Sequence, residues 1–174
     1  MLAGAKRIEL LRQLHAGPGR SVSELGAAVG IKRSDASQEL RRIQSRGLLK
    51  CRRQGVPLIY RMESDPQVSS AAPLLKALQT AFSGYPVNQD SRICGIAHGL
   101  ASARREAIVR TLMNAPKSAV ALRTHLNLSA PALAQNILTL MYSGFIKLKT
   151  GQYHFRCPAH PVARALIKLL PPPG

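Results

Sequence analysis

Aromatic side chains and carboxylates are scarce in this sequence. Tryptophan is absent, and Phe, Trp and Tyr together make up 4% of the 174 residues. Proteins that stack on single-stranded bases or read RNA loops rely on aromatic side chains, so the composition argues against those classes. The eight Asp and Glu residues form no spaced pair suited to acid–base chemistry or Mg²⁺ binding, and neither GxxxxGK[ST] nor GxSxG occurs. We therefore expect a protein that is not an enzyme.

Cysteine is also sparse, with three residues spread widely along the chain. An odd number at such spacing does not suggest a disulfide framework. The closest approaches to a metal-binding pattern are Cys94 with His98, four residues apart, and the run His154, Cys157 and His160. Zinc needs three or more converging N or S ligands, and neither group contains a CxxC pair. We expect these side chains to pack rather than to bind metal, and we expect no cofactor.

Long apolar runs are missing as well. No uninterrupted apolar stretch approaches the roughly 18 residues that a membrane span requires. Residues 1–15 are charged throughout and lack the apolar core of a secretory signal. These features predict a cytoplasmic protein without a membrane partner.

Positive charge, in contrast, is abundant. Twenty-five Lys and Arg face eight Asp and Glu, which gives a net charge of +17 and a pI near 11.1. Solubility alone needs a net charge of only about 2–8 in a small domain. Residues 1–64 and 104–174 carry +8 and +9, whereas 65–103 are neutral. Such a field attracts polyanions, of which nucleic acid is the first candidate and an anionic membrane surface the second. A DNA partner would associate the chain with the nucleoid.

The sequence contains an internal repeat. A shift of 97 residues aligns identical residues at five positions and preserves the apolar pattern between them. The identical pairs are Ser21 and Ser118, Leu25 and Leu122, Gln38 and Gln135, Gly47 and Gly144, and Lys50 and Lys147. We predict an N-terminal domain over residues 1–85, a linker or leading segment over 86–102, and a C-terminal domain over 103–174.

Both copies show the same order of predicted elements. Apolar periodicity and turn residues in the first copy predict helices over 7–14, 22–29 and 33–46, strands over 49–53 and 58–62, and a helix over 72–82. The second copy has predicted helices over 103–114, 118–126 and 130–143, a hairpin over 146–156 about Thr150 and Gly151, and a helix over 162–170. The predicted fold class is mainly α with small β-hairpins (α+β).

A short helix, a turn, a longer helix and a basic hairpin together make the layout of a winged helix-turn-helix. A helix fits the major groove of B-DNA, where side chains distinguish all four base pairs. The preceding helix braces it, and a cationic hairpin reaches neighbouring phosphates. The sequence therefore predicts two winged helix-turn-helix domains in tandem that bind double-stranded DNA.

The first copy resembles the ArsR-type winged helix family of bacterial repressors. The resemblance lies in residues 21–55, SVSELGAAVGIKRSDASQELRRIQSRGLLKCRRQG, in 57–62, PLIYRM, and in the leading segment of the second copy, AHGLASARREAIVRTL. It implies a transcriptional regulator whose DNA-reading positions are Arg33, Ser34, Ser37, Gln38 and Arg41. Gln suits adenine, Arg suits guanine and Ser suits either base. In the hairpin, Arg52 and Arg53, helped by Lys50, are expected to hold phosphate.

That family forms homodimers through its first and last helices, so a tandem of two units in one chain would act as a pseudo-dimer. We expect a monomer, with self-association through the closing helices, predicted over 72–82 and 162–170, as the alternative. The usual metal-binding cysteine pair of the family is missing from residues 23–26.

The second copy departs from the DNA-reading pattern. Its equivalent helix face offers Ala130, Pro131, Ala134, Gln135 and Leu138, of which only Gln135 suits a base edge. Its hairpin region stays basic through Lys147, Lys149 and Arg156. This copy is expected either to hold phosphates and set the register or to contact a protein. An architectural protein that coats DNA without sequence choice remains a further alternative.

Overall fold

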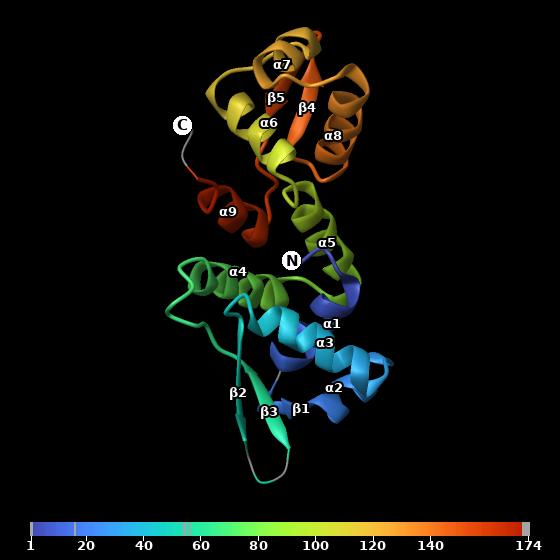
Figure 1. Ribbon diagram of the computed structural model, residues 1–174, viewed down its shortest axis with the longest axis vertical. Helices are drawn as coiled ribbons and strands as arrows, with labels where there is room; N and C mark the ends of the chain where they lie inside the picture. Colours follow the sequence, from blue (N-terminus) through green and yellow to red (C-terminus); the bar gives the residue numbers. More distant parts are fainter. Residues whose placement is uncertain (1, 16, 54, 56, 172–174) are drawn as a thin grey trace. The chain divides into compact units, whose positions relative to one another are not determined.

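The computed structural model describes residues 2–15, 17–53, 55 and 57–171, and it is mainly helical with small antiparallel sheets (Figure 1). This confirms the predicted α+β class. The chain divides into two compact units, the first ending at Cys94 and the second beginning at Gly95.

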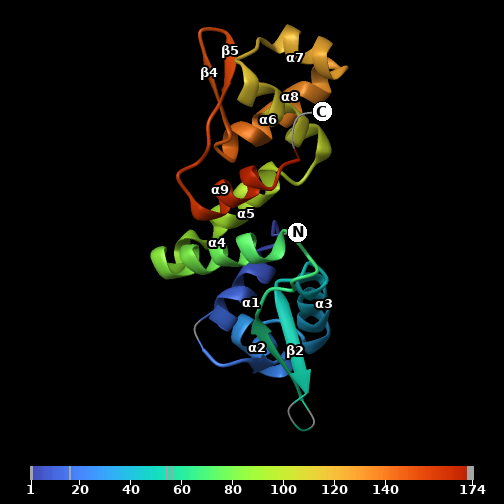
Figure 2. The same ribbon diagram turned by 90° about the vertical axis from the view of Figure 1, so that its left-hand side faces the viewer.

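The first unit packs its first three helices against a small sheet. Its elements are α1 (Ala5–His15), β1 (Arg20–Ser21), α2 (Val22–Val29), α3 (Arg33–Gln44), β2 (Leu49–Arg53), β3 (Leu58–Met62), α4 (Ala71–Gly84) and the 3-10 helix η1 (Val87–Gln89). The strands are antiparallel in the order β1-β3-β2. The β2–β3 hairpin extends beyond the helices (Figures 1 and 2).

Local signals explain where the helices of the first unit begin and end. The Ser21 hydroxyl accepts a hydrogen bond from the Glu24 backbone N–H, and the Glu24 carboxylate accepts one from the Ser21 N–H, which is a capping box. α2 ends at Gly30 in the left-handed conformation. Beyond α3, Gly47 has a φ of 71°, and a Cβ built there would lie 2.9 Å from Val68. The turn from α3 into β2 therefore needs glycine at position 47 for two reasons, its backbone conformation and the lack of space for a side chain.

The second unit repeats this arrangement. Its elements are α6 (Ala103–Asn114), α7 (Ala119–Leu126), α8 (Ala130–Tyr142), β4 (Ile146–Lys149), β5 (Gln152–Phe155) and α9 (Pro161–Lys168). The antiparallel hairpin lies against α6 through β5 and against α8 through β4 (Figure 2). Ser118 and Ser129 cap α7 and α8 through their hydroxyls.

The repeat seen in the sequence is present in the elements. α2 and α7 have equal lengths and are offset by 97 residues, as are the first residues of α3 and α8 and of β2 and β4. The turns match too, because Gly30 and Asn127 both end a helix in the left-handed region, and Gly47 and Gly144 both have positive φ. The two copies therefore share one local architecture.

Three elements were not predicted. β1 adds a third strand to the first sheet, and the segment predicted as a linker, 86–102, holds η1 and a further helix, α5 (Asp90–Gly99). The unit boundary falls within α5 rather than at its ends. Ile93, Ile96, Ala97 and Leu100 are buried at helical spacing, a pattern that two glycines interrupt in the sequence.

Candidate nucleic-acid interface

The outer face of α3 carries most of the predicted DNA-reading residues. Leu40 and Ile43 are fully buried, as expected for the inner face of this helix. Ser34, Gln38 and Arg41 are exposed on the other side. The Ser34 hydroxyl donates a hydrogen bond to the neighbouring Asp35 carboxylate over 3.3 Å. The helix therefore presents a polar, cationic surface to the exterior while its apolar stripe closes the core.

A groove of about 390 Å³ lies between α3, the start of α2 and the β2–β3 hairpin. The residues around it include Arg33, Ser37 and Arg41 from α3 and Arg53 from the hairpin. The groove thus brings together four residues that the sequence predicted as DNA contacts. The side chains of its three arginines form no hydrogen bond or ion pair with the residues that the structure describes. Their charge and their donors are available to an anion.

Several groove residues were not predicted from the sequence. They are Ser21, Val22 and Ser23 at the start of α2 and Pro57, Leu58 and Tyr60 in the hairpin. Tyr60 is buried. Burial raises the pKa of its phenol, the nearby Cys51 adds to the rise, and the Arg41 charge opposes it. Only the packing of the hairpin against α2 and α3 shows that these residues line the groove.

The hairpin register separates the two arginines that the sequence paired as phosphate contacts. Arg53 pairs with Leu58, and Arg52 pairs with Ile59. Successive side chains of a strand point to opposite faces. Arg53 therefore shares the face of Tyr60 and the groove, whereas Arg52 lies on the reverse face. Both arginines were expected to hold phosphate, and the register shows that they would have to do so from opposite faces of the hairpin.

Lys50 has a partner within the hairpin. Its ammonium donates a hydrogen bond to the Glu63 carboxylate over 2.8 Å. This bond lowers the pKa of Glu63. Desolvation opposes the effect, and the charges of Lys50, Arg52 and Arg61 add to it. Because Glu63 partly neutralises it, Lys50 offers less charge to a phosphate than the sequence suggested. Glu63 follows β3, and the sequence did not indicate that it would lie beside Lys50.

A second carboxylate organises the inner edge of α3. Burial raises the pKa of Glu39, but hydrogen bonds and charge from Arg7 and Arg42 outweigh that effect and hold the pKa below its usual value. Arg7 lies on α1, so the Arg7–Glu39 ion pair joins the first helix to α3. These contacts fix the helix without using the arginines of the groove.

The equivalent helix of the second unit has a different outer surface. Gln135 is exposed, as predicted, and so are Pro131 and Ala134. Leu138 and Tyr142 lie four residues apart on the same face, with 50% and 91% of their surfaces exposed. The outer face of α8 is therefore largely apolar where that of α3 is polar and cationic.

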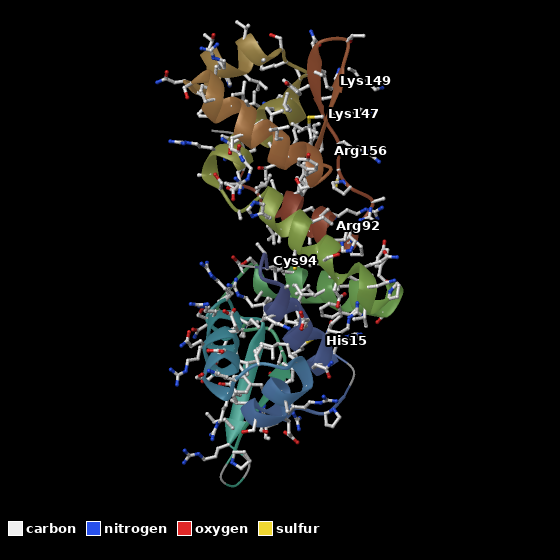
Figure 3. All side chains as sticks on the ribbon, turned by 90° about the vertical axis from the view of Figure 1, so that its right-hand side faces the viewer. His15, Arg92, Cys94, Lys147, Lys149 and Arg156 are labelled. Carbon is white, nitrogen blue, oxygen red and sulfur yellow. The ribbon has the colours of Figure 1, made fainter. Side chains whose placement is uncertain are left out.

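The second hairpin keeps its predicted basic residues. Figure 3 shows Lys147, Lys149 and Arg156 following one another along the β4–β5 hairpin and the chain beyond it. The charge of Lys149 lowers the pKa of Lys147, with smaller contributions from desolvation and from the charge of Arg156. Three like charges this close together repel one another, and a bound anion would relieve that repulsion.

The suggested metal patterns do not converge. Among the described residues, no group of three or more His, Cys, Asp or Glu side chains is placed to hold a metal ion. His160 is buried at the start of α9, where its Nδ1 accepts a hydrogen bond from the Val162 N–H. This histidine therefore acts as a helix cap. Within the same described part of the chain, every helix is too short or too polar to cross a membrane.

Comparisons with protein-family models, with curated proteins and with solved structures gave no match to this chain.

Proposed function

We propose that this protein is a transcriptional regulator that binds double-stranded DNA through two winged helix-turn-helix units in tandem. The order of helix, helix, helix, hairpin and closing helix in each unit supports the fold part of the proposal. The functional part rests above all on the groove beside α3, where Arg33, Arg41 and Arg53 converge without a carboxylate partner among the described residues.

In this proposal, α3 lies in the major groove. Gln38 and Arg41 on its outer face have the donors and acceptors that distinguish adenine and guanine. Arg53, across the groove from the helix, is placed to meet a phosphate beside the bases that α3 reads. One helix and one hairpin then supply the two kinds of contact, sequence reading and anchoring, that a specific DNA complex needs.

The charge distribution supports contact with DNA by both units. Residues 1–94 contain fifteen Lys and Arg against seven Asp and Glu, and residues 95–174 contain ten against one. Each unit thus carries a charge of +8 or +9 of its own. We assign the second unit the role of holding phosphates through Lys147, Lys149 and Arg156, because its α8 offers only Gln135 to a base edge.

The apolar face of α8 favours a second role for the second unit, contact with a protein. Leu138 and Tyr142 expose large apolar surface on a unit that has a single carboxylate, Glu106. A partner with an apolar face flanked by carboxylates matches this surface in both polarity and charge. Replacing Leu138 and Tyr142 by serine should then leave DNA affinity unchanged, whereas a large loss would assign α8 to DNA.

Selection of binding sites from random duplex DNA tests the main proposal. We expect a short, well-defined motif that disappears when Gln38 and Arg41 are both replaced by alanine. Binding without enrichment would indicate an architectural protein that coats DNA without sequence choice. Absence of binding at low salt would reject DNA as the partner.

A further inference from the structure

The second unit contains a cavity that the proposed DNA contacts do not use. It has a volume of about 400 Å³ and lies between α6 and α7. Sites for small ligands have volumes of about 300–1,000 Å³, so this one suits a compact molecule. Its basic lining residues are Arg110, Lys117 and His125, and no carboxylate is among the residues around it.

The basic residues come from three separate segments. Arg110 lies on α6, and His125 lies in the last turn of α7. Lys117 lies in the connection between these helices, where its backbone exchanges two hydrogen bonds with Tyr153 of β5, at 2.8 and 3.2 Å. The hairpin thus fixes the backbone of Lys117, and the cavity is held by the fold rather than by a free loop.

The polar side chains around the cavity have no partner among the described residues. This holds for Arg110, Lys117 and His125 and also for Thr111 and Asn114. Thr111 is the most telling, because only 8% of its surface is exposed. The hydroxyls of other helical threonines in this unit donate to the carbonyl four residues earlier, as at Thr124 and Thr139. The Thr111 hydroxyl makes no such bond and remains available to a ligand.

The charge balance of the cavity favours an anion. α6 and α7 both end beside it, at Asn114 and Leu126, and each helix C-terminus contributes about half a negative charge. Arg110 and Lys117 together outweigh these two ends, even with His125 neutral. The single carboxylate of the unit, Glu106, is not among the lining residues.

We propose that this cavity binds a small organic anion through a carboxylate or phosphate group. Arg110 and Lys117 neutralise that group, and the Thr111 hydroxyl donates a hydrogen bond to it. The apolar part of the ligand lies against Ala107, Ala115 and Leu126, which complete the apolar share of the lining. A phosphate of DNA has the same head-group chemistry, so the experiment must separate a free anion from DNA.

Backbone NMR of the full chain, titrated with benzoate and with inorganic phosphate, tests the proposal. We expect saturable shifts in α6, in α7 and at Lys117 at millimolar concentrations. Benzamide, which has the shape of benzoate without its charge, should bind at least tenfold more weakly, because charged hydrogen bonds contribute about 1.5–3 kcal/mol each. Lys117→Gln should weaken the binding of benzoate by roughly tenfold for the same reason. Thr111→Val should also weaken benzoate binding, without changing the charge of the cavity.

Lys149→Gln is the matched control, because it removes the same charge from the same unit outside the cavity. The proposal is overturned if this variant weakens benzoate binding as much as Lys117→Gln does, or if the shifts spread evenly over the basic hairpin. It is also overturned if the shifts do not saturate with either anion. A repeat in the presence of saturating duplex DNA identifies the source of the anion. Persisting benzoate shifts support a free ligand, and their loss would assign the cavity to a DNA phosphate.

Discussion

Arg12 and Asp90 are 78 residues apart in the sequence and form the most buried ion pair among the described residues. The Arg12 Nε donates to Oδ2 of Asp90 over 3.0 Å, and the two side chains are 13% and 10% exposed. The same guanidinium donates to the carbonyl oxygens of Phe82 and Tyr85 and lies 4.6 Å from the centre of the Phe82 ring. One side chain of α1 therefore holds the end of α4 and the start of α5.

This network leads to a prediction about stability. Arg12→Ala leaves the Asp90 carboxylate buried without its partner, and such a loss costs about 3–5 kcal/mol. We expect a decrease of that size in the free energy of unfolding, measured by urea denaturation. Lys6→Ala removes the same charge from an exposed side chain that pairs with Glu9 and donates a hydrogen bond to the Val29 carbonyl, and it should cost no more than about 1 kcal/mol. Equal losses in the two variants would show that net charge, and not the network, controls stability.

The two hairpin arginines should differ in their effect on DNA binding. Arg53→Ala removes a cation from the groove, so affinity should fall for all sequences, and the slope of log K against log salt should flatten by about 0.9. Arg52→Ala removes an equal charge from the reverse face of the hairpin and should change both quantities less. Fluorescence anisotropy over a salt series measures them. A larger effect of Arg52 would place the DNA on the other face.

Substitutions in α3 should alter specificity more than general affinity. Gln38→Ala or Arg41→Ala is expected to lose about 1–3 kcal/mol on the selected site and little on random DNA, because each removes a proposed contact to a base edge. Gln135→Ala on α8 is the matched comparison from the second copy. If Gln135→Ala shifts the selected motif and Gln38→Ala does not, the reading and anchoring roles of the two units are exchanged.

Local sequence signals were enough for most of the elements. The bounds of α2, β2 and β3 agree with the predicted ranges because caps, turn glycines and alternation act over a few residues. Part of what escaped prediction depends on contacts between distant residues. β1 is only two residues long and is defined by its pairing with β3. The partner of Lys50 in β2 is Glu63, which directly follows the other strand of the hairpin.

The candidate site was predicted in the same uneven way. The outward face of α3 follows from helical periodicity, so Gln38 and Arg41 could be named from the sequence. The separation of Arg52 from Arg53 follows from strand alternation but acquires meaning only once the hairpin is packed against α3. The contribution of Tyr60 and the start of α2 to the groove has no local signature. The lining of the groove at that level comes from tertiary packing.

The oligomeric state tests the expectation that one chain acts as a pseudo-dimer. In α4, the apolar residues Leu74, Leu75 and Leu78 are buried, whereas Leu166 and Ile167 of α9 are only partly covered. We expect a mass near 18.8 kDa by sedimentation at micromolar concentration. A charge of +17 opposes association at low salt, so the measurement needs both low and high salt to expose any apolar contact between copies.

A monomer at both salt concentrations supports the pseudo-dimer, and a stable species of twice the mass rules out its simplest form. If a dimer forms only at high salt, two variants identify its interface. Leu166→Ser should dissociate a dimer formed through the closing helices into monomers. Leu138→Ser should do the same to a dimer formed through the outer face of α8. The second result would show that α8 can bury its apolar face against a second copy, and it would weaken the assignment of that face to an acidic partner.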